Sequence, residues 1–560
     1  MSKRDICFST EQSIEIRFEL DGVQLSGTLK TAHNNMAVVT VSDFDTNKMP
    51  FTSKVDKKNL IECESTQGKY TLLNCDCYGE TIYPEYVVKG TYDFTFDTVV
   101  VSIHGLSTWF NNNSRYELDE CGLAKKFDLD KFCEVVTYGQ HKYEIQNKHS
   151  CVISHKGEKN YLVSEKDTIQ IKCLSKTLSL DEAKHLAWKI KILVSILSGE
   201  ALSFENIWIV NNSTKQYNSI YYSDFTYLKE PFSSRFDLFC TARYLFSENL
   251  WETVLTNFFE NDHFEKLWPQ LYSIFSYEGS WHFDFMNHVI LLDRYCSLIA
   301  DKRNFKGLKW DNEALKLQLE QEIELFAKNG TDKRKTVKHI ISHIKASKIP
   351  PFKQKYEFTM NFISNDVKEM IAFKEDDFDL MKAIRDQAAH GSEVKTKESK
   401  SISYEVIVKN RLLVLLMYLS FNELGFKQQH FAVCLDRTLK KFVRSANFNK
   451  KEKDRLAGNV PFIPLSHDFN KDKYPRSRFY VVLKHNRKDN SYYIDDPVSA
   501  LTDSWPASKE LKKYKDVKEL VKDKVEDKDF SDCEFVNRVY LCVGNGDEYL
   551  CNAVIIISYN

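Results

Sequence analysis

An arginine and a histidine stand five residues apart near the end of a helical pattern, in the segment MKAIRDQAAHGSE (residues 381–393). A histidine whose pKa is near neutrality can accept the proton of a ribose 2′-hydroxyl or donate one to a leaving 5′-oxygen. An arginine keeps its positive charge at physiological pH, and its planar fork fits a phosphate group. Arg385 and His390 therefore have the side-chain types needed to cleave RNA without a metal ion.

The spacing alone is a weak signal, because the chain has 15 histidines and such a coincidence is common. Arg334 and His339 have the same separation. They lie in a basic helical pattern, KRKTVKHIISHIKASK, where five positions turn two side chains about 140° apart around the helix axis. The residues around each pair must therefore decide between them.

The surroundings of Arg385 and His390 favour this pair. The preceding segment DDFDLMKAI is amphipathic, with apolar residues at helical spacing that can face a core. The residues between the pair are small or polar, and Gly391 allows the helix to unwind at the histidine. A polar loop follows, so the pair is placed to meet a polymer substrate. The apolar residues are Phe378, Met381 and Ile384.

Two acidic residues are candidates for supporting roles. Asp386 directly follows Arg385 and can orient His390 or position a substrate, although it can equally be a polar residue at a helix end. Asp293 stands in the otherwise apolar segment HVILLDRYCSLIADKR. A lone acid there is either functional or paired with a nearby cation such as Arg294.

Two basic stretches are candidates for contact with an RNA backbone. Residues 333–355 contain no acidic residue, and residues 437–455 contain only two. In a chain near neutrality, such a local excess is what phosphate contact requires, although a charge run can also be a solvated helix face. The candidate RNA-contacting residues are Lys333, Arg334, Lys335, Lys338, Lys440, Lys441 and Arg444.

Composition and cysteine usage limit the class of protein. A chain of 560 residues is too long for one hydrophobic core, so we expect about two to four domains. The formal net charge of −1 gives no overall basic field, so any nucleic-acid binding must come from local patches. The 14 cysteines include no Cys-x-x-Cys pair and no zinc-type spacing, which indicates a reducing, cytoplasmic protein. We expect no metal site and no cofactor.

No segment has the pattern of an export signal or a membrane span. The start of the chain, MSKRDICFSTEQ, lacks the apolar core of a signal peptide. The longest apolar stretch, residues 411–421, is too short to cross a bilayer and fits a core helix. We therefore expect a soluble protein.

Short strands dominate the first part of the chain. Residues 13–30 alternate apolar and polar side chains around Asp21-Gly22, which predicts a hairpin. Seven further strand-like segments, one of them residues 98–110 and the last ending near residue 174, favour an antiparallel sandwich or barrel-like domain. A helix should follow, because Ser179 and Glu182 have capping-box spacing and Gly199 can end it.

Helical patterns fill the chain from about residue 233 to 425. Apolar residues at three- and four-residue spacing predict helices over 235–246, 282–303 and 312–330. Residues 402–425 form the longest apolar helix, with Gly425 as its C-cap. About five or six such helices make a bundle. After it, four strand-like segments and a charged helix-like segment over 509–529 predict a further α+β part.

Two features together resemble a known family. The segment IRDQAAHG resembles the Arg-x4-6-His motif of HEPN domains, which favour a polar residue directly after the arginine and place the motif before the last long helix of a bundle. The strand-rich part ending in SLDEAKHLAWKIKILVSILSGEALSFENIWI resembles the ApeA group of bacterial anti-phage HEPN proteins. The resemblance covers roughly residues 1–425, and it places Asp293 where ApeA-like sequences tend to carry an acidic residue.

The resemblance implies the fold. We predict a multidomain α+β protein with a β-rich, sandwich-like ApeA N-terminal domain over residues 1–230, which ends in a helix. An all-α HEPN helical bundle follows over residues 231–428. A small α+β C-terminal extension covers residues 429–560.

The resemblance also implies an activity. A HEPN ribonuclease of the abortive-infection type would cleave host RNA, with tRNA the expected substrate, when a phage component triggers it. Attack by the 2′-hydroxyl would leave a 2′,3′-cyclic phosphate and a 5′-hydroxyl. One arginine and one histidine do not supply both an acid and a base, so we expect a homodimer with a composite site. The alternatives are a non-catalytic HEPN module for interaction or nucleotide binding, and a scaffold.

Overall fold

A computed structural model describes the chain in two compact units, residues 1–448 and residues 449–560. The sequence-based boundaries at residues 230 and 428 stay predictions. The described residues are 5–32, 35–42, 55–90, 92, 95–110, 116–118, 124–126, 130–155, 161–224, 232, 234–305, 321, 323–324, 350–390, 402–466, 481–502, 514–525, 529–544 and 546–560.

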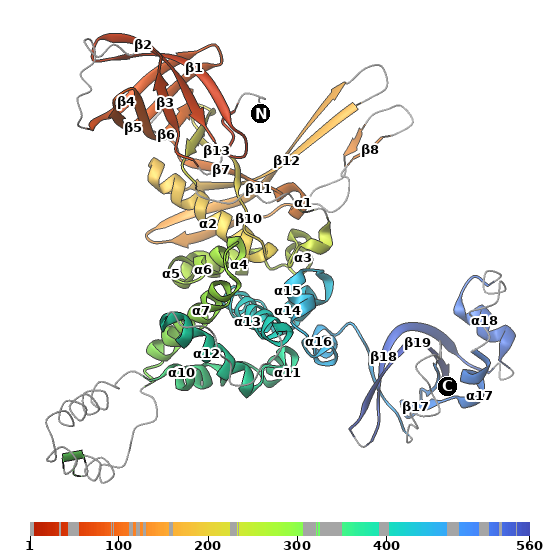
Figure 1. Ribbon diagram of the computed structural model, residues 1–560. Helices are drawn as coiled ribbons and strands as arrows, with labels where there is room; N and C mark the ends of the chain where they lie inside the picture. The colour runs from red at the N-terminus through yellow and green to blue at the C-terminus, as the bar shows by residue number, and fades with distance from the viewer. Residues whose placement is uncertain are drawn as a thin grey trace. The chain divides into compact units, whose positions relative to one another are not determined.

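The first strands of the chain close into a barrel. They pair in the order β6-β3-β2-β1-β4-β5, and β5 pairs again with β6, which closes the ring (Figure 1). The predicted hairpin is confirmed, because Asp21 and Gly22 take positive φ angles of 51° and 81° between β1 and β2. The strands are β1 (Gln12–Leu20), β2 (Val23–Thr31), β3 (Val38–Val41), β4 (Asp56–Ser65), β5 (Gly68–Tyr78) and β6 (Thr81–Lys89).

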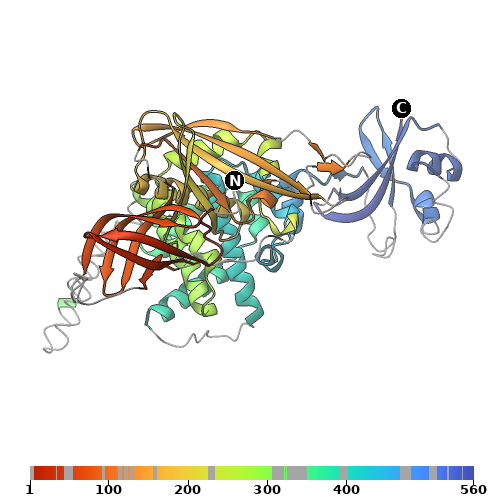
Figure 2. The same cartoon turned by 90° about the horizontal axis from the view of Figure 1, so that it is seen from above.

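The sheet continues beyond the barrel. Strand β6 also pairs with β14, and the order runs on as β14-β13-β7-β12-β11-β10 to complete a 12-stranded sheet. Figure 2 shows the barrel, in red, from above. The predicted β-rich N-terminal region is thus confirmed. The added strands are β7 (Thr98–Ile103), β10 (Cys133–Tyr138), β11 (His141–His155), β12 (Tyr161–Cys173), β13 (Phe204–Asn211) and β14 (Gln216–Tyr222), and β8 (Tyr116–Leu118) pairs separately with β9 (Ala124–Lys126).

Helix α2 (Leu180–Ser198) forms where the sequence predicts a helix and packs on the continued sheet. The expectation that the N-terminal domain ends in this helix is wrong, because β13 and β14 follow it and pair within the same sheet. Ser179 accepts a hydrogen bond from the backbone of Glu182, and the Glu182 carboxylate accepts one from Ser179, which completes the capping box. Gly199 ends the helix in the left-handed region at φ 68°. One expectation upstream is wrong, because residues 106–110 leave the strand pattern and form helix α1 (Leu106–Phe110).

In the helical part of the first unit, α7 is central, because it contacts α10, α12 and α13. The predicted helices over 282–303 and 402–425 are confirmed, and Gly425 follows α13 at φ 92°. The single helix predicted over 235–246 is wrong. A 3-10 turn (η1, Arg235–Asp237) comes first, and α3 begins only after Thr241, whose hydroxyl caps it. The segment 312–330 lies outside the described residues apart from 321, 323 and 324.

The bounds of these helices follow. They are α3 (Ala242–Ser247), α4 (Trp251–Glu260), α5 (His263–Lys266), α6 (Pro269–Ser276), α7 (Trp281–Lys302), α10 (Phe352–Met360), α11 (Asn365–Ile371), α12 (Glu375–His390), α13 (Ile402–Glu423), α14 (Gln428–Arg437) and α15 (Lys441–Ser445). Across the described ranges of the chain, no helix is both long enough and apolar enough to cross a bilayer.

The second unit is an α+β half-barrel, which confirms the predicted fold class of this part. Its sheet has the order β15-β18-β19-β16-β17. Two clusters of buried side chains form its core, one including Val482 and Val521 of α18, the other including Leu483 and Val539. Its elements are α16 (Lys450–Ala457), β15 (Phe462–Pro464), β16 (Val481–Asn486), β17 (Ser491–Ile494), α17 (Asp496–Thr502), α18 (Val517–Lys524), β18 (Asp532–Cys542) and β19 (Glu548–Tyr559).

Candidate active site

Helix α12 carries both residues of the candidate pair, and its first turn is firmly anchored. Acidic residues fill this turn, where they complement the positive end of the helix dipole. The fully buried Asp377 carboxylate accepts hydrogen bonds from the backbone of Lys374 (3.0 Å), from Arg411 Nη1 (3.0 Å) and from the Tyr404 hydroxyl. The predicted apolar face is confirmed, because Phe378, Met381 and Ile384 are all buried.

Arg385 follows this apolar face and is held by groups from three helices. Its Nε and Nη2 lie 3.2 and 3.1 Å from Oδ1 of Asp386, the next residue of α12. Its Nη1 donates to Oδ2 of Asp293 on α7 at 3.1 Å. The guanidinium also lies over the ring of Phe352 on α10, 5.1 Å from its centroid, which is within cation–π range. These contacts fix the guanidinium in one orientation.

Asp293 connects this arginine to a second cation. Its Oδ2 accepts from Arg385, and its Oδ1 accepts from Lys355 Nζ at 2.9 Å. Lys355 also donates to the Ser297 hydroxyl at 2.7 Å, and Ser297 donates to the Asp293 carbonyl at 2.8 Å. The structure thus brings together Arg385, Asp293 and Asp386, and it adds Lys355. The sequence offered Arg294 as a partner for Asp293, but Arg294 instead contacts Gln270 and the Lys266 carbonyl.

His390 is the last residue of α12, and its side chain lies outside the described residues. Helix α12 includes His390, and Gly391, which the sequence expects to let the helix unwind, lies outside the described residues. In a regular α-helix, five positions turn a side chain by about 140° and advance it by about 7.5 Å. The backbone positions of Arg385 and His390 are therefore on different sides of the α12 axis.

Two family models match the chain, and they cover the two regions described above. One is the model of the ApeA N-terminal domain 1, over residues 20–261, and the other is the model of the Apea-like HEPN domain, over residues 286–430. The chain carries an ApeA N-terminal domain and an Apea-like HEPN domain. Neither the curated proteins nor the solved structures gave a significant match.

The HEPN match includes every residue around the guanidinium. Asp293, Phe352, Lys355, Arg385 and Asp386 all lie within residues 286–430. Sequence reasoning did not single out Phe352 or Lys355. Their spacing of three residues on one helix is the only local sign that they share a face, because their partners lie far away in the chain.

The candidate RNA-contacting residues have different surroundings. Lys333, Arg334, Lys335 and Lys338 lie outside the described residues. Lys440 is buried, and its ammonium pairs with Glu200 Oε1 at 2.6 Å. Two others, Lys441 and Arg444, are exposed on α15.

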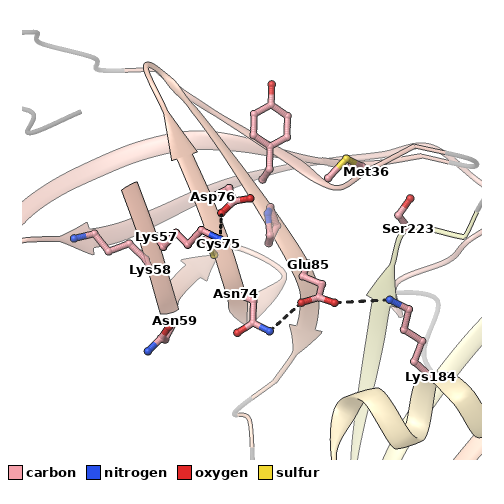
Figure 3. Close-up of a pocket in the computed structure, with 12 residues that line it drawn as sticks. Met36, Lys57, Lys58, Asn59, Asn74, Cys75, Asp76, Glu85, Lys184 and Ser223 are labelled. Carbon is pink, nitrogen blue, oxygen red and sulfur yellow. Dashed lines mark hydrogen bonds and ion pairs between the residues drawn. The ribbon is translucent and has the colours of Figure 1, made fainter. Parts of the chain in front are cut away.

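Two hollows lie apart from the arginine. One, of about 510 Å³, opens on the barrel and is lined by polar side chains that pair with one another, including Asn74 with Glu85 and Glu85 with Lys184 (Figure 3). The other, of about 870 Å³, is lined in part by His288 and Lys441. Arg385 lines neither of them, so we do not assign the reaction to either hollow.

His288 and Asp284 lie one helical turn apart on α7. His288 is buried, and its Nδ1–H donates to the Asp284 carbonyl at 2.6 Å. The Asp284 carboxylate pairs with Lys409. Burial lowers the pKa of His288 to about 4, although the carboxylate and carbonyl of Asp284 act in the opposite direction. His288 is therefore a neutral core histidine at physiological pH.

Proposed function

We propose that this protein is a metal-independent endoribonuclease of abortive-infection defence, which cleaves host RNA, with tRNA as the expected substrate. The observation that carries the proposal is the oriented guanidinium of Arg385 in the HEPN domain. It lies in the second half of α12, is held by Asp293 and Asp386, and its side chain remains 29% exposed. A guanidinium that is both fixed and accessible can bind a phosphate group.

The chemistry follows from the two side chains. Arg385 would hold the scissile phosphate and stabilise the negative charge that develops on its oxygens. His390 would take the proton of the ribose 2′-hydroxyl, or return a proton to the 5′-oxygen as its bond to phosphorus breaks. The 2′-oxygen forms the new bond to phosphorus, so the products are a 2′,3′-cyclic phosphate and a 5′-hydroxyl. DNA has no 2′-hydroxyl and would not react.

A composite site in a homodimer completes this proposal. Acid and base are both needed, and one chain supplies a single motif histidine. The backbone geometry supports the same arrangement, because Arg385 and His390 of one chain stand on different sides of the α12 axis. A two-fold axis would bring two copies of the motif face to face. Lys441 and Arg444, both exposed, are the described candidates for contact with the RNA backbone.

The trigger is also part of the proposal. A ribonuclease that cleaves host RNA must stay silent before infection, because constant activity would harm its own cell. We place the reception of a phage component in the β-rich N-terminal region or in the α+β second unit.

A second candidate function is a non-catalytic HEPN module that mediates assembly. One observation favours it: the Arg385 guanidinium already donates to two carboxylates, as expected of a residue that only links helices. On this alternative, replacing His390 would change the oligomeric state and leave RNA intact.

A cleavage assay separates the two functions. The purified full chain would be incubated with bulk tRNA, with and without extract from phage-infected cells, and the RNA ends would be analysed. We expect 2′,3′-cyclic phosphate ends with the wild-type chain, and a loss of roughly 100-fold or more in rate with Arg385→Lys, because an ammonium cannot reproduce the fork. Arg294→Lys, an exposed arginine on α7, serves as the matched control and should cleave normally. Intact tRNA under all these conditions would favour the assembly module.

A further inference from the structure

Lys355 is a nearly buried cation linked to the carboxylate that holds Arg385. Its side chain is only 12% exposed, whereas that of Asp293 is 27% exposed. Removing an ammonium group from water is costly unless its partners are well placed. Lys355 Nζ has two such partners, Asp293 Oδ1 at 2.9 Å and the Ser297 hydroxyl at 2.7 Å.

Lys355 holds the Asp293 carboxylate by the oxygen that Arg385 does not bind. Lys355 binds Oδ1 of Asp293 and Arg385 binds Oδ2, so the carboxylate plane is set by two cations from two different helices. Phe352 lies one turn earlier on the same helix as Lys355 and supports the face of the guanidinium. Helix α10 therefore contacts both members of the Asp293–Arg385 pair.

The positive charge of Lys355 also changes the net charge around the Arg385 guanidinium. Arg385, Asp293 and Asp386 together carry a net charge of −1, which would repel a phosphate that approaches the guanidinium. Lys355 brings the charge of the group to zero. It does so from a buried position, so it has no need to touch the RNA itself.

We propose that Lys355 is a positioning residue of the ribonuclease site: it holds Asp293, and through Asp293 it sets the orientation and the electrostatic surroundings of Arg385. This inference rests on the proposed ribonuclease activity. It adds α10 to the helices that build the site.

The test is a double-mutant cycle on cleavage. The rate of tRNA cleavage, as kcat/KM, would be measured for full-length Lys355→Met, Asp293→Asn and the double variant, in the same activating extract. We expect Lys355→Met to lower kcat/KM by roughly 10- to 100-fold, because small displacements of a phosphate-binding group are costly. In the Asp293→Asn background, the same change should cost less than about threefold, because the carboxylate that Lys355 positions is then no longer charged.

Two further variants separate positioning from folding. Lys355→Arg keeps a donor and a charge, so it should restore at least part of the lost rate. Lys353, on the same helix as Lys355, forms an exposed ion pair with Glu375 of α12. Lys353→Met removes this cation and should leave the rate unchanged. Wild-type rates for Lys355→Met would overturn the inference, and so would losses that simply add in the double variant.

Failure of the proposed ribonuclease function can be distinguished from failure of the inference about Lys355. If the wild-type chain itself leaves tRNA intact, the ribonuclease proposal fails in that assay. The same cycle would then be run on binding of 2′-O-methyl RNA, which cannot be cleaved. Coupling between Lys355 and Asp293 in RNA affinity would support the positioning role, and additive effects would overturn it.

Discussion

At the residue scale, the Arg385 guanidinium donates to two carboxylates that are not held equally. Asp293 is fixed by Lys355 and its side chain is 27% exposed, whereas the Asp386 side chain is 44% exposed. An ion pair open to water is worth only about 1 kcal/mol or less. A phosphate group can therefore displace Asp386 from the guanidinium more easily than it can displace Asp293.

Removing the Asp386 charge should strengthen RNA binding. In Asp386→Asn the guanidinium loses its exposed competitor, so we expect the affinity for non-cleavable 2′-O-methyl RNA to rise by roughly fivefold, which corresponds to about 1 kcal/mol. Fluorescence anisotropy would measure it. Asp379→Asn makes the same charge change at an exposed position of α12 and should leave the affinity within about twofold. Weaker binding by Asp386→Asn would mean that this carboxylate helps to hold the RNA.

At the element scale, some of the contacts that position α12 could be predicted from the sequence and others could not. The apolar face of α12, the capping box at Ser179 and the turn at Asp21-Gly22 were predictable, because each depends on residues a few positions apart. The pairing of Asp377 with Arg411 was not predictable, because it depends on how α12 and α13 pack.

The same reason applies to the barrel and to the site. Closure of the barrel needs β6 to pair with both β3 and β5, and continuation of the sheet needs it to pair with β14, which no local pattern specifies. The sequence identified Arg385 and Asp386 by motif, and Asp293 by its apolar surroundings. It did not identify Lys355, because its contact with Asp293 joins residues 62 positions apart.

The Asp377–Arg411 pair should dominate the stability of the helical region. Asp377→Asn would leave the buried Arg411 charge without its carboxylate, and we expect a loss of about 3–5 kcal/mol in the free energy of unfolding. Chemical denaturation followed by circular dichroism would measure it. Asp379→Asn, two positions along α12, should change stability by less than about 0.5 kcal/mol. A small effect of Asp377→Asn would show that the pair does not anchor α12.

Helix α7 should lose stability in mild acid because of His288. The pKa of this histidine is 6.5 in its ordinary state and about 4 in the folded chain, so between these values the unfolded chain binds a proton that the folded chain does not. Stability is therefore lost as the pH falls from about 6.5 toward 4. Between pH 7 and pH 5 we expect this group to account for a loss of roughly 2 kcal/mol.

Unfolding free energies at pH 7, 6 and 5 would test this. His288→Asn keeps an amide N–H for the Asp284 carbonyl but cannot titrate, so its stability should fall less steeply with pH than that of the wild type. His282→Asn, at an exposed position of the same helix, should keep the wild-type slope. An equal slope in the His288 variant would show that protonation of this histidine does not limit stability.

At the scale of the whole molecule, the proposal requires two chains. One motif supplies one arginine and one histidine, and their backbone positions are on different sides of the α12 axis. A dimer whose single site takes residues from both chains should therefore lose more activity, when active and inactive chains are mixed, than chains that act singly.

Mixing active and inactive chains should reveal the composite site. In dimers assembled from equal amounts of wild-type and His390→Ala chains, about a quarter would be wild-type pairs, so total activity should fall to about a quarter if both copies are needed. Chains that act singly would retain about half. The mixture must be co-expressed or refolded together so that the subunits exchange. Activity near half of the wild-type value would contradict the composite site.

The most direct test of the account is end-specific RNA sequencing from phage-infected bacteria that carry the wild-type chain or His390→Ala, at equal protein levels. We expect new 2′,3′-cyclic phosphate ends in host RNA, with tRNA foremost, in the wild-type strain and their absence in the mutant. Identical RNA ends in the two strains, with infection and expression confirmed, would contradict it and leave Arg385 and His390 with a role in assembly alone.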